Sequence, residues 1–195
     1  MSTWNASTMK DEISRAAEHL LQGGIILYPT DTIWGIGCDA TDPGAVERIY
    51  RIKERFDRKS MLVLMDSLSM VEDYVESIPS AAYEVMEIAT RPTTIIYPAA
   101  RNLAPNLVAG DGSIGIRIPD DPFCLGLIGT TGRPIVSTSA NISGNPPPQL
   151  FGEIVPEIIL AVDYAVDWRR KEGSPATPST VIKIDGEGRT TVLRP

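Results

Sequence analysis

A chain of 195 residues, with 43% apolar and 22% charged side chains, is long enough to bury the core of one globular domain. A single histidine excludes a metal site built from several histidines, and two cysteines outside any zinc-type spacing argue against a disulfide framework. The net charge of −7 disfavours broad nonspecific binding to nucleic acid. With no signal peptide and no long apolar run, we expect a cytoplasmic protein without membrane contact.

The hydrophobic pattern predicts helices and short strands that alternate through the first half of the chain. The predicted helices are about Thr8–Gln22, a helix from Asp42-Pro43 onward, Ser69–Glu76 and Ser80–Ala89. Gly23-Gly24 is a stop signal for the first of these helices, and Asp42-Pro43 is a typical start for the second. The predicted strands in this half are Ile25–Tyr28, Met61–Met65 and Thr94–Tyr97.

Strands dominate the predicted second half. They are Ile114–Ile118, Pro134–Ser137, Tyr164–Trp168, Thr180–Ile184 and Thr191–Leu193. Helices that alternate with strands at first, followed by a strand-rich end, predict a single α/β domain over residues 1–195 with a mixed, twisted sheet.

Four segments next to predicted strands concentrate residues that can contact a ligand. The first, residues 28–37, reads Tyr-Pro-Thr-Asp-Thr-Ile-Trp-Gly-Ile-Gly, and its hydroxyls and glycines would let a ligand approach the backbone closely. Taken alone, this segment fits better with a turn whose polar side chains bind the local backbone. It has too few glycines for a dinucleotide fingerprint, and the chain contains no GxxxxGK phosphate loop.

The second segment, residues 48–59, carries six basic and two acidic residues on an otherwise acidic chain. This charge suits a small anionic ligand such as a triphosphate. It equally suits a solvated helix C-terminus that complements the helix dipole, so these residues alone leave the choice even.

The third segment places Arg117 in an apolar alternating strand. If Ile114, Ile116 and Ile118 face the core, Arg117 shares the opposite face with Ser113 and Gly115. That face is either simply exposed or a clamp for a carboxylate.

The fourth segment, residues 137–144, reads Ser-Thr-Ser-Ala-Asn-Ile-Ser-Gly. It is either a serine-rich turn or a recognition loop. Because the only histidine, His19, lies far away in the sequence, hydrogen-bonding recognition is favoured over a nucleophilic serine.

The four segments in this order resemble the YrdC-like threonylcarbamoyl-adenylate synthases. The pattern is Tyr-Pro-Thr-Asp-Thr-x-x-Gly-x-Gly, Lys-x-Arg, Gly-x-Arg-x-Pro and Ser-x-Ser-Ala-Asn-x-Ser-Gly, followed by Pro178–Ile182 and Leu193–Pro195. The resemblance covers about Gly24 to Pro195 and implies an open, twisted sheet with a large, concave, positively charged cavity. It also implies a nucleotidyltransferase that condenses L-threonine, bicarbonate or CO₂, and ATP with Mg²⁺, for N6-threonylcarbamoyladenosine modification of tRNA.

The resemblance also implies residue roles. The catalytic signature would be Lys53, Arg55, Ser139 and Asn141. The nucleotide would contact Arg55, Lys59, Ser113, Asn141 and Arg194, and threonine would contact Thr32, Arg117, Ser139 and Ser179. No residue is expected to bind a metal directly. The chain departs from the common pattern at Ser60-Met61, Leu64 and Arg91-Pro92-Thr93-Thr94, which affects the details of substrate contact.

Charge neutralisation suffices for this chemistry, in which an N-carboxy anion of threonine attacks the α-phosphorus of ATP and pyrophosphate leaves. We expect the product to pass to a tRNA threonylcarbamoyl transferase, with at most weak contact to tRNA or double-stranded RNA. Two alternatives stay open: an RNA-binding module of the same fold without synthase activity, and a related enzyme that acts on another carbamoyl-type intermediate.

Overall fold

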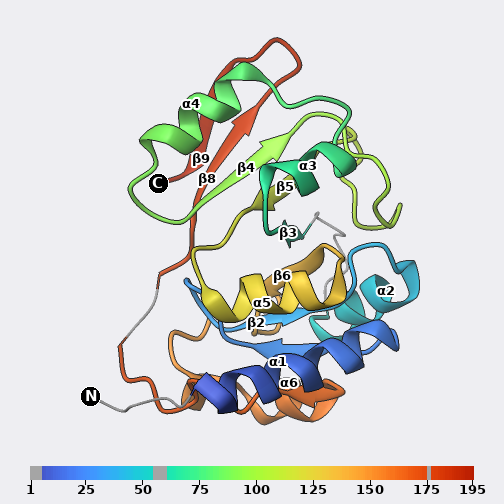
Figure 1. Ribbon diagram of the computed structural model, residues 1–195, viewed down its shortest axis with the longest axis vertical. Helices are drawn as coiled ribbons and strands as arrows, with labels where there is room; N and C mark the ends of the chain where they lie inside the picture. The colour runs from blue at the N-terminus through green and yellow to red at the C-terminus, as the bar shows by residue number, and fades with distance from the viewer. Residues whose placement is uncertain (1–5, 55–60, 175–176) are drawn as a thin grey trace.

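One mixed sheet runs through the computed structural model, which describes residues 6–54, 61–174 and 177–195 (Figure 1). Its strands are β1 (Ile26–Tyr28), β2 (Gly35–Gly37), β3 (Leu62–Leu64), β4 (Thr93–Tyr97), β5 (Ile114–Arg117), β6 (Ile135–Ser139), β7 (Tyr164–Ala165), β8 (Thr180–Ile184) and β9 (Thr190–Arg194). Among the described residues the order is β7-β1-β2-β6-β3-β5-β4-β8-β9. The pairs β1–β7, β3–β5 and β4–β8 are parallel and the other pairs are antiparallel. The predicted mixed α/β sheet is confirmed.

The helices are α1 (Ala6–Leu21), α2 (Pro43–Ile52), α3 (Leu68–Tyr74), α4 (Ser80–Ile88), α5 (Pro122–Thr131) and α6 (Pro156–Ala161), with a short 3₁₀ turn at Phe151–Glu153. Aspartates cap two of them. The Asp42 carboxylate accepts from the backbone N–H of Gly44 at 2.8 Å, and the Asp121 carboxylate accepts from that of Cys124 at 2.9 Å. Each cap pairs backbone donors that the first helical turn leaves without an internal partner. None of the described helices is both long and apolar enough to cross a membrane.

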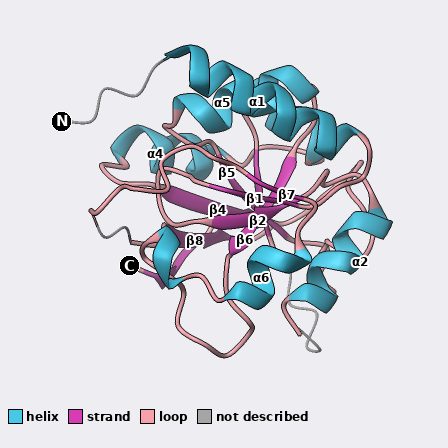
Figure 2. Cartoon of the chain, turned by 90° about the horizontal axis from the view of Figure 1, so that it is seen from below, coloured by secondary structure: helices cyan, strands magenta, loops and turns pink. Residues whose placement is uncertain are grey.

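The sheet has a separate apolar core on each face. Successive strand residues point to opposite sides, so Ile26 and Tyr28 pack with α1 and α5, whereas Leu27 packs with the core on the other face. That second core also takes in buried residues of α2, α3, α4 and α6. Figure 2 shows α1 and α5 on one side of the strands and α2 and α6 on the other.

Three elements differ from the sequence prediction. Helix α5 was not predicted, because buried residues occur around much of it and Gly126 and Gly129 weaken its helical signal. Its packing explains Gly126: a Cβ there would lie 2.7 Å from Ile13 Cδ1, so the glycine lets α5 approach α1. Strand β2 was read as part of a loop, and α6 interrupts the predicted strand-rich end.

Candidate active site

A cavity of about 280 Å³ lies on the face of the sheet that packs against α1 and α5. The two helices cover one end of this face, and the cavity opens at the other end. Strand β3 shows the transition: Leu64 packs into the α1–α5 core, whereas Leu62, two residues earlier, lines the cavity. Strand β6 does the same, with Ile135 in that core and Ser137 and Ser139 on the cavity wall. On β6, small residues follow a large one along this face, and the shorter side chains help to form the hollow.

The two glycines of β2 are required for different structural reasons. A Cβ on Gly35, which pairs with Ser139, would lie 3.1 Å from Ser137 Oγ and would narrow the cavity wall. A Cβ on Gly37 would lie 2.5 Å from the carbonyl oxygen of Val136 and 2.7 Å from the Tyr28 ring. The Gly-x-Gly motif thus combines one glycine at the cavity with one required by packing.

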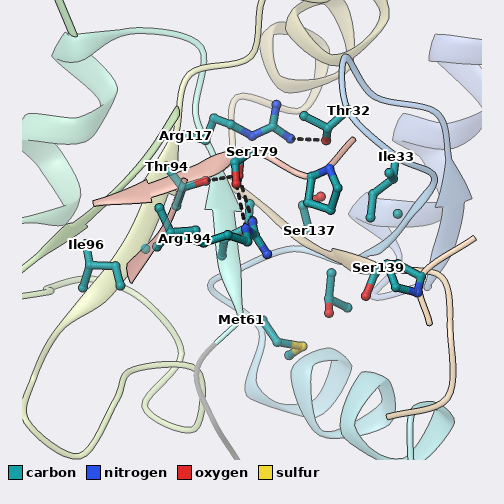
Figure 3. A pocket seen from close by; sticks show the side chains of 17 residues that line it. Thr32, Ile33, Met61, Thr94, Ile96, Arg117, Ser137, Ser139, Ser179 and Arg194 are labelled. Carbon is teal, nitrogen blue, oxygen red and sulfur yellow. Dashed lines mark hydrogen bonds between the residues drawn. The ribbon is translucent and has the colours of Figure 1, made fainter. Parts of the chain in front are cut away.

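Arg117 lies at the end of β5 and is only 2% exposed. Its Nη1 forms an ion pair with Asp31, and its Nη2 donates to Thr32 Oγ1 at 3.2 Å (Figure 3). Its Nε has no hydrogen-bond partner among the described residues. The prediction that Arg117 shares a face with Gly115, opposite Ile114 and Ile116, is confirmed, because the two isoleucines lie in the core and the other two residues line the cavity. The alternative of a simply exposed face is wrong.

Ser179, just before β8, contacts two other cavity residues, Thr94 of β4 and Arg194 of β9. Its hydroxyl lies 2.8 Å from Thr94 Oγ1 and accepts from Arg194 Nη2 at 3.3 Å, while its carbonyl accepts from Arg194 Nε at 2.8 Å (Figure 3). Arg194 is largely exposed as a residue, but partial desolvation of its guanidinium, reinforced by the positive charge of Arg117, lowers the pKa of Arg194. Two guanidinium groups line this cavity, and none of its described lining residues carries a carboxylate. The cavity therefore suits an anion.

Lys53 holds the Ser139–Asn141 segment. It follows α2, is 2% exposed, and its ammonium donates to the carbonyl oxygens of Ser139 at 2.5 Å and Asn141 at 2.8 Å. The Asn141 amide in turn donates to the carbonyl of Asn145 at 2.6 Å. Of these residues only Ser139 lines the cavity, so Lys53 and Asn141 shape the loop that carries it.

Ser113 lies before β5 and does not line this cavity. Its hydroxyl donates to Asp111 at 2.6 Å, and Lys183 donates to the other oxygen of that carboxylate at 2.8 Å. These two donors, Lys183 first, hold the pKa of Asp111 well below its ordinary value. Two further predicted nucleotide contacts, Arg55 and Lys59, lie outside the described residues.

One residue from each of the three departures from the family pattern can be placed. Leu64 is fully buried against α1 and α5 and so lies away from the cavity. Thr94 and Met61 line the cavity, but neither was singled out as a ligand contact from the sequence. The available signal for Thr94 was a hydroxyl within an apolar strand. The apolar wall formed by Ile33, Leu62 and Val181 carries no sequence signal, because such residues look like ordinary core.

The described residues contain no group of three or more His, Cys, Asp or Glu side chains placed to hold a metal ion. Mg²⁺ prefers carboxylate, phosphate and water oxygens, and the described cavity wall offers no carboxylate. This wall does not fit a resident Mg²⁺ ion, so we expect any Mg²⁺ to enter on the phosphates of the nucleotide.

Comparison with known proteins identifies the family of the chain. The Sua5/YciO/YrdC family model, described as "Telomere recombination", matches residues 18–195. A protein named threonylcarbamoyl-AMP synthase from Xanthomonas axonopodis pv. citri is 34% identical over 174 residues, which cover 87% of this chain and 91% of the relative. A protein of the same name from Stenotrophomonas maltophilia is 32% identical over 173 residues.

Solved structures share the fold. P. abyssi Sua5 complexed with L-threonine superposes with a TM-score of 0.83 at 28% identity, covering 95% of this chain. The match covers 54% of the Sua5 chain, so this protein spans about half of Sua5. E. coli YciO superposes with a TM-score of 0.82 at 27% identity, covering 95% of this chain and 89% of YciO.

Proposed function

Because this chain belongs to the Sua5/YciO/YrdC family, we propose that it is a threonylcarbamoyl-adenylate synthase, a nucleotidyltransferase that acts in N6-threonylcarbamoyladenosine formation on tRNA. Relatives that it matches over 87% of its length carry the name threonylcarbamoyl-AMP synthase. The observation in this chain that supports the proposal most directly is the Arg117 guanidinium, which is buried beside Thr32 in a cavity that also contains Ser139 and Ser179.

Threonine would bind between the hydroxyl groups and Arg117. A guanidinium binds a carboxylate through two parallel N–H donors, and Arg117 has one buried donor, Nε, that no described residue uses. The hydroxyls of Thr32, Ser139 and Ser179 supply further donors and acceptors for the amino and hydroxyl groups of the substrate. The apolar wall would take the threonine methyl group.

The reaction begins when the threonine amine adds to CO₂ and releases a proton to water, or condenses with bicarbonate and loses water, to give an N-carboxy anion. An oxygen of that anion then forms a bond to the α-phosphorus of ATP, and the bond from this phosphorus to the pyrophosphate oxygen breaks. Mg²⁺ on the nucleotide neutralises part of the phosphate charge when it is bound. No protein nucleophile is required, so the chain's task is to hold two anions together and to stabilise developing charge.

The nucleotide would occupy the side of the cavity nearer β9. Arg194 is exposed at this edge and carries a positive charge there, which suits a phosphate. Lys53 would act through the position of Ser139, since its ammonium is bonded to the loop. Nucleotide contacts by Arg55, Lys59, Ser113 and Asn141 stay predictions of the family resemblance.

The wider setting follows from the same proposal. The mixed anhydride product would pass to a tRNA threonylcarbamoyl transferase in the cytoplasm. RNA contact would be weak, because the chain has a net charge of −7 and phosphate contacts depend on salt.

One experiment tests the function. The purified protein is incubated with ATP, Mg²⁺, bicarbonate and L-threonine, and the adenylate is measured by mass spectrometry together with pyrophosphate release. Both signals should require threonine and bicarbonate. Pyrophosphate release that continues at the same rate without threonine would exclude the synthase. An adenylate that forms from another carbamoyl donor instead would favour the related enzyme.

A further inference from the structure

We propose that Asp31 is a positioning residue of the synthase, which holds Arg117 by one end so that the opposite edge of its guanidinium is presented to the carboxylate of threonine. The inference rests on the proposed function and adds a residue to it. It starts from the ion pair between Asp31 and Arg117 Nη1, which joins the β1–β2 loop to the end of β5.

Asp31 lies behind Arg117, away from the substrate. Its side chain is 10% exposed and does not line the cavity that contains Arg117. It lines two neighbouring cavities of about 650 and 670 Å³ instead. Its second oxygen accepts the backbone N–H of Asp120 at 3.3 Å, just beyond β5. The carboxylate is thus fixed from both sides and can fix Arg117 in turn.

The hydrogen bonds of Arg117 show which edge is left for a ligand. A guanidinium has five N–H donors in a rigid plane, and Nε and Nη2 form its side edge, whereas Nη1 lies at the other end. Asp31 takes Nη1, and Thr32 Oγ1 accepts from Nη2 at 3.2 Å. Nε is buried and has no partner among the described residues. A buried donor without a partner is unfavourable, and a carboxylate on the Nε–Nη2 edge would pair it.

Asp31 also supplies the counter-charge that Arg117 needs when the cavity holds no anion. An unpaired buried cation is costly, and a carboxylate partner reduces that cost. Because the partner sits at Nη1, it compensates the charge without occupying the Nε–Nη2 edge. The same residue can therefore stabilise the empty site and orient the occupied one.

The test compares Asp31→Ala and Asp31→Asn with the unmodified protein and with Asp120→Ala as a matched control. Asp120 is an exposed residue at the same end of β5, and its hydrogen bond to Asp31 comes from the backbone N–H, which Asp120→Ala keeps. Asp31→Ala would let Arg117 move away from the substrate, and loss of the charged hydrogen bond between Arg117 and threonine predicts that KM for threonine rises about 10- to 100-fold. KM for ATP should stay within about twofold, since the nucleotide does not use this edge. Asp31→Asn keeps an oxygen acceptor and should show a smaller rise, and Asp120→Ala should show none.

A binding measurement separates positioning from general damage. L-threoninol has an alcohol in place of the threonine carboxylate, so it cannot use the Nε–Nη2 edge in the same way. Calorimetry should show that Asp31→Ala weakens the binding of threonine but leaves the binding of threoninol nearly unchanged. The preference of the protein for threonine over threoninol should therefore fall. Equal weakening of threonine, threoninol and ATP would show a merely structural role and overturn the proposal. Unchanged threonine binding in both Asp31 variants would also overturn it.

The variant Arg117→Ala distinguishes failure of the positioning role of Asp31 from failure of the proposed threonine site. If Arg117→Ala leaves threonine binding unchanged, the threonine site itself is wrongly placed. If Arg117→Ala abolishes binding while the Asp31 variants do not affect it, only the positioning role fails. Should Asp31→Ala not fold, Asp31→Asn carries the test, because it changes the charge with almost no change in shape.

Discussion

The Lys53 ammonium lies 2.5 Å from the carbonyl oxygen of Ser139, a residue 86 positions later in the chain. This contact joins the end of α2 to the end of β6, so Lys53 of the basic segment is fixed to the serine-rich segment. The lysine of the Lys-x-Arg motif therefore helps to build the cavity wall.

Lys53→Ala should lower both stability and turnover. It would leave two partly buried carbonyl oxygens without their charged donor, which predicts a loss of about 1–3 kcal/mol in the free energy of unfolding. Turnover should fall by about 10²–10³-fold, the usual cost of losing one preorganised group of an active site. Urea unfolding and pyrophosphate release measure the two effects. Arg51→Ala, which removes an exposed ion pair with Glu47 on the same helix, is the control and should change neither by much.

Arg194→Ala should weaken the binding of ATP more than the binding of threonine. Its guanidinium lies at the cavity edge, and loss of a phosphate contact predicts a rise of about tenfold in KM for ATP. Arg189→Ala is the matched control. Arg189 is an exposed arginine just before β9, and it forms an ion pair with Asp185. Equal effects of the two substitutions on ATP would mean that Arg194 contributes only general charge.

Gly37→Ala should destabilise the sheet without touching a ligand. The added Cβ would lie 2.5 Å from the Val136 carbonyl oxygen, and such overpacking costs about 1–3 kcal/mol. Gly129→Ala on α5 is the contrast, since nothing lies within 4 Å of its Cβ position and helix propensity predicts a gain of up to about 1 kcal/mol. The midpoint temperature of thermal unfolding should fall for Gly37→Ala and rise for Gly129→Ala.

Asp111→Asn should lower stability only above acid pH. Hydrogen bonds from Lys183 and Ser113 lower the pKa of Asp111 in the folded chain. Because the pKa of Asp111 is lower in the folded chain, ionised Asp111 stabilises the fold above the ordinary aspartate pKa of about 3.8. This stabilisation is lost as the pH falls through the pKa of the folded state. The difference in unfolding free energy between the two proteins should therefore be visible at pH 6 and shrink below about pH 3.8. A difference that stays constant down to acid pH would contradict the assignment.

His19→Ala should keep nearly full activity. The ring stacks on Tyr164 with centroids 4.9 Å apart and does not line the cavity. The proposed chemistry needs no imidazole base, so the pH–rate curve should lose no limb near the reference histidine pKa of ~6.5. A loss of activity greater than about tenfold, in a variant that unfolds like the parent, would reveal a proton transfer that charge neutralisation does not cover.

The sequence predicted the parts of this molecule that periodicity and motif order encode. Asp42-Pro43 begins α2 as expected, and Arg117 shares its face with Gly115. Helix α5 escaped prediction because a helix with buried residues around much of its circumference lacks a polar stripe. The bond from Lys53 to Ser139 could not be read from the chain, since only the sheet order brings α2 and β6 together.

The spread of the cavity residues along the chain has a consequence for the timing of synthesis. Thr32 lies near the beginning and Arg194 near the end, and β8 joins the sheet beside β4 in parallel. The wall cannot close until β9 has been made. At the usual ~5–20 residues per second, the interval between the two residues lasts roughly 8 to 32 s. Between the synthesis of Arg117 and that of Ser179, the nascent chain has the first of these residues but lacks Ser179 and Arg194, so we expect the ligand site to form only once β9 has emerged from the ribosome.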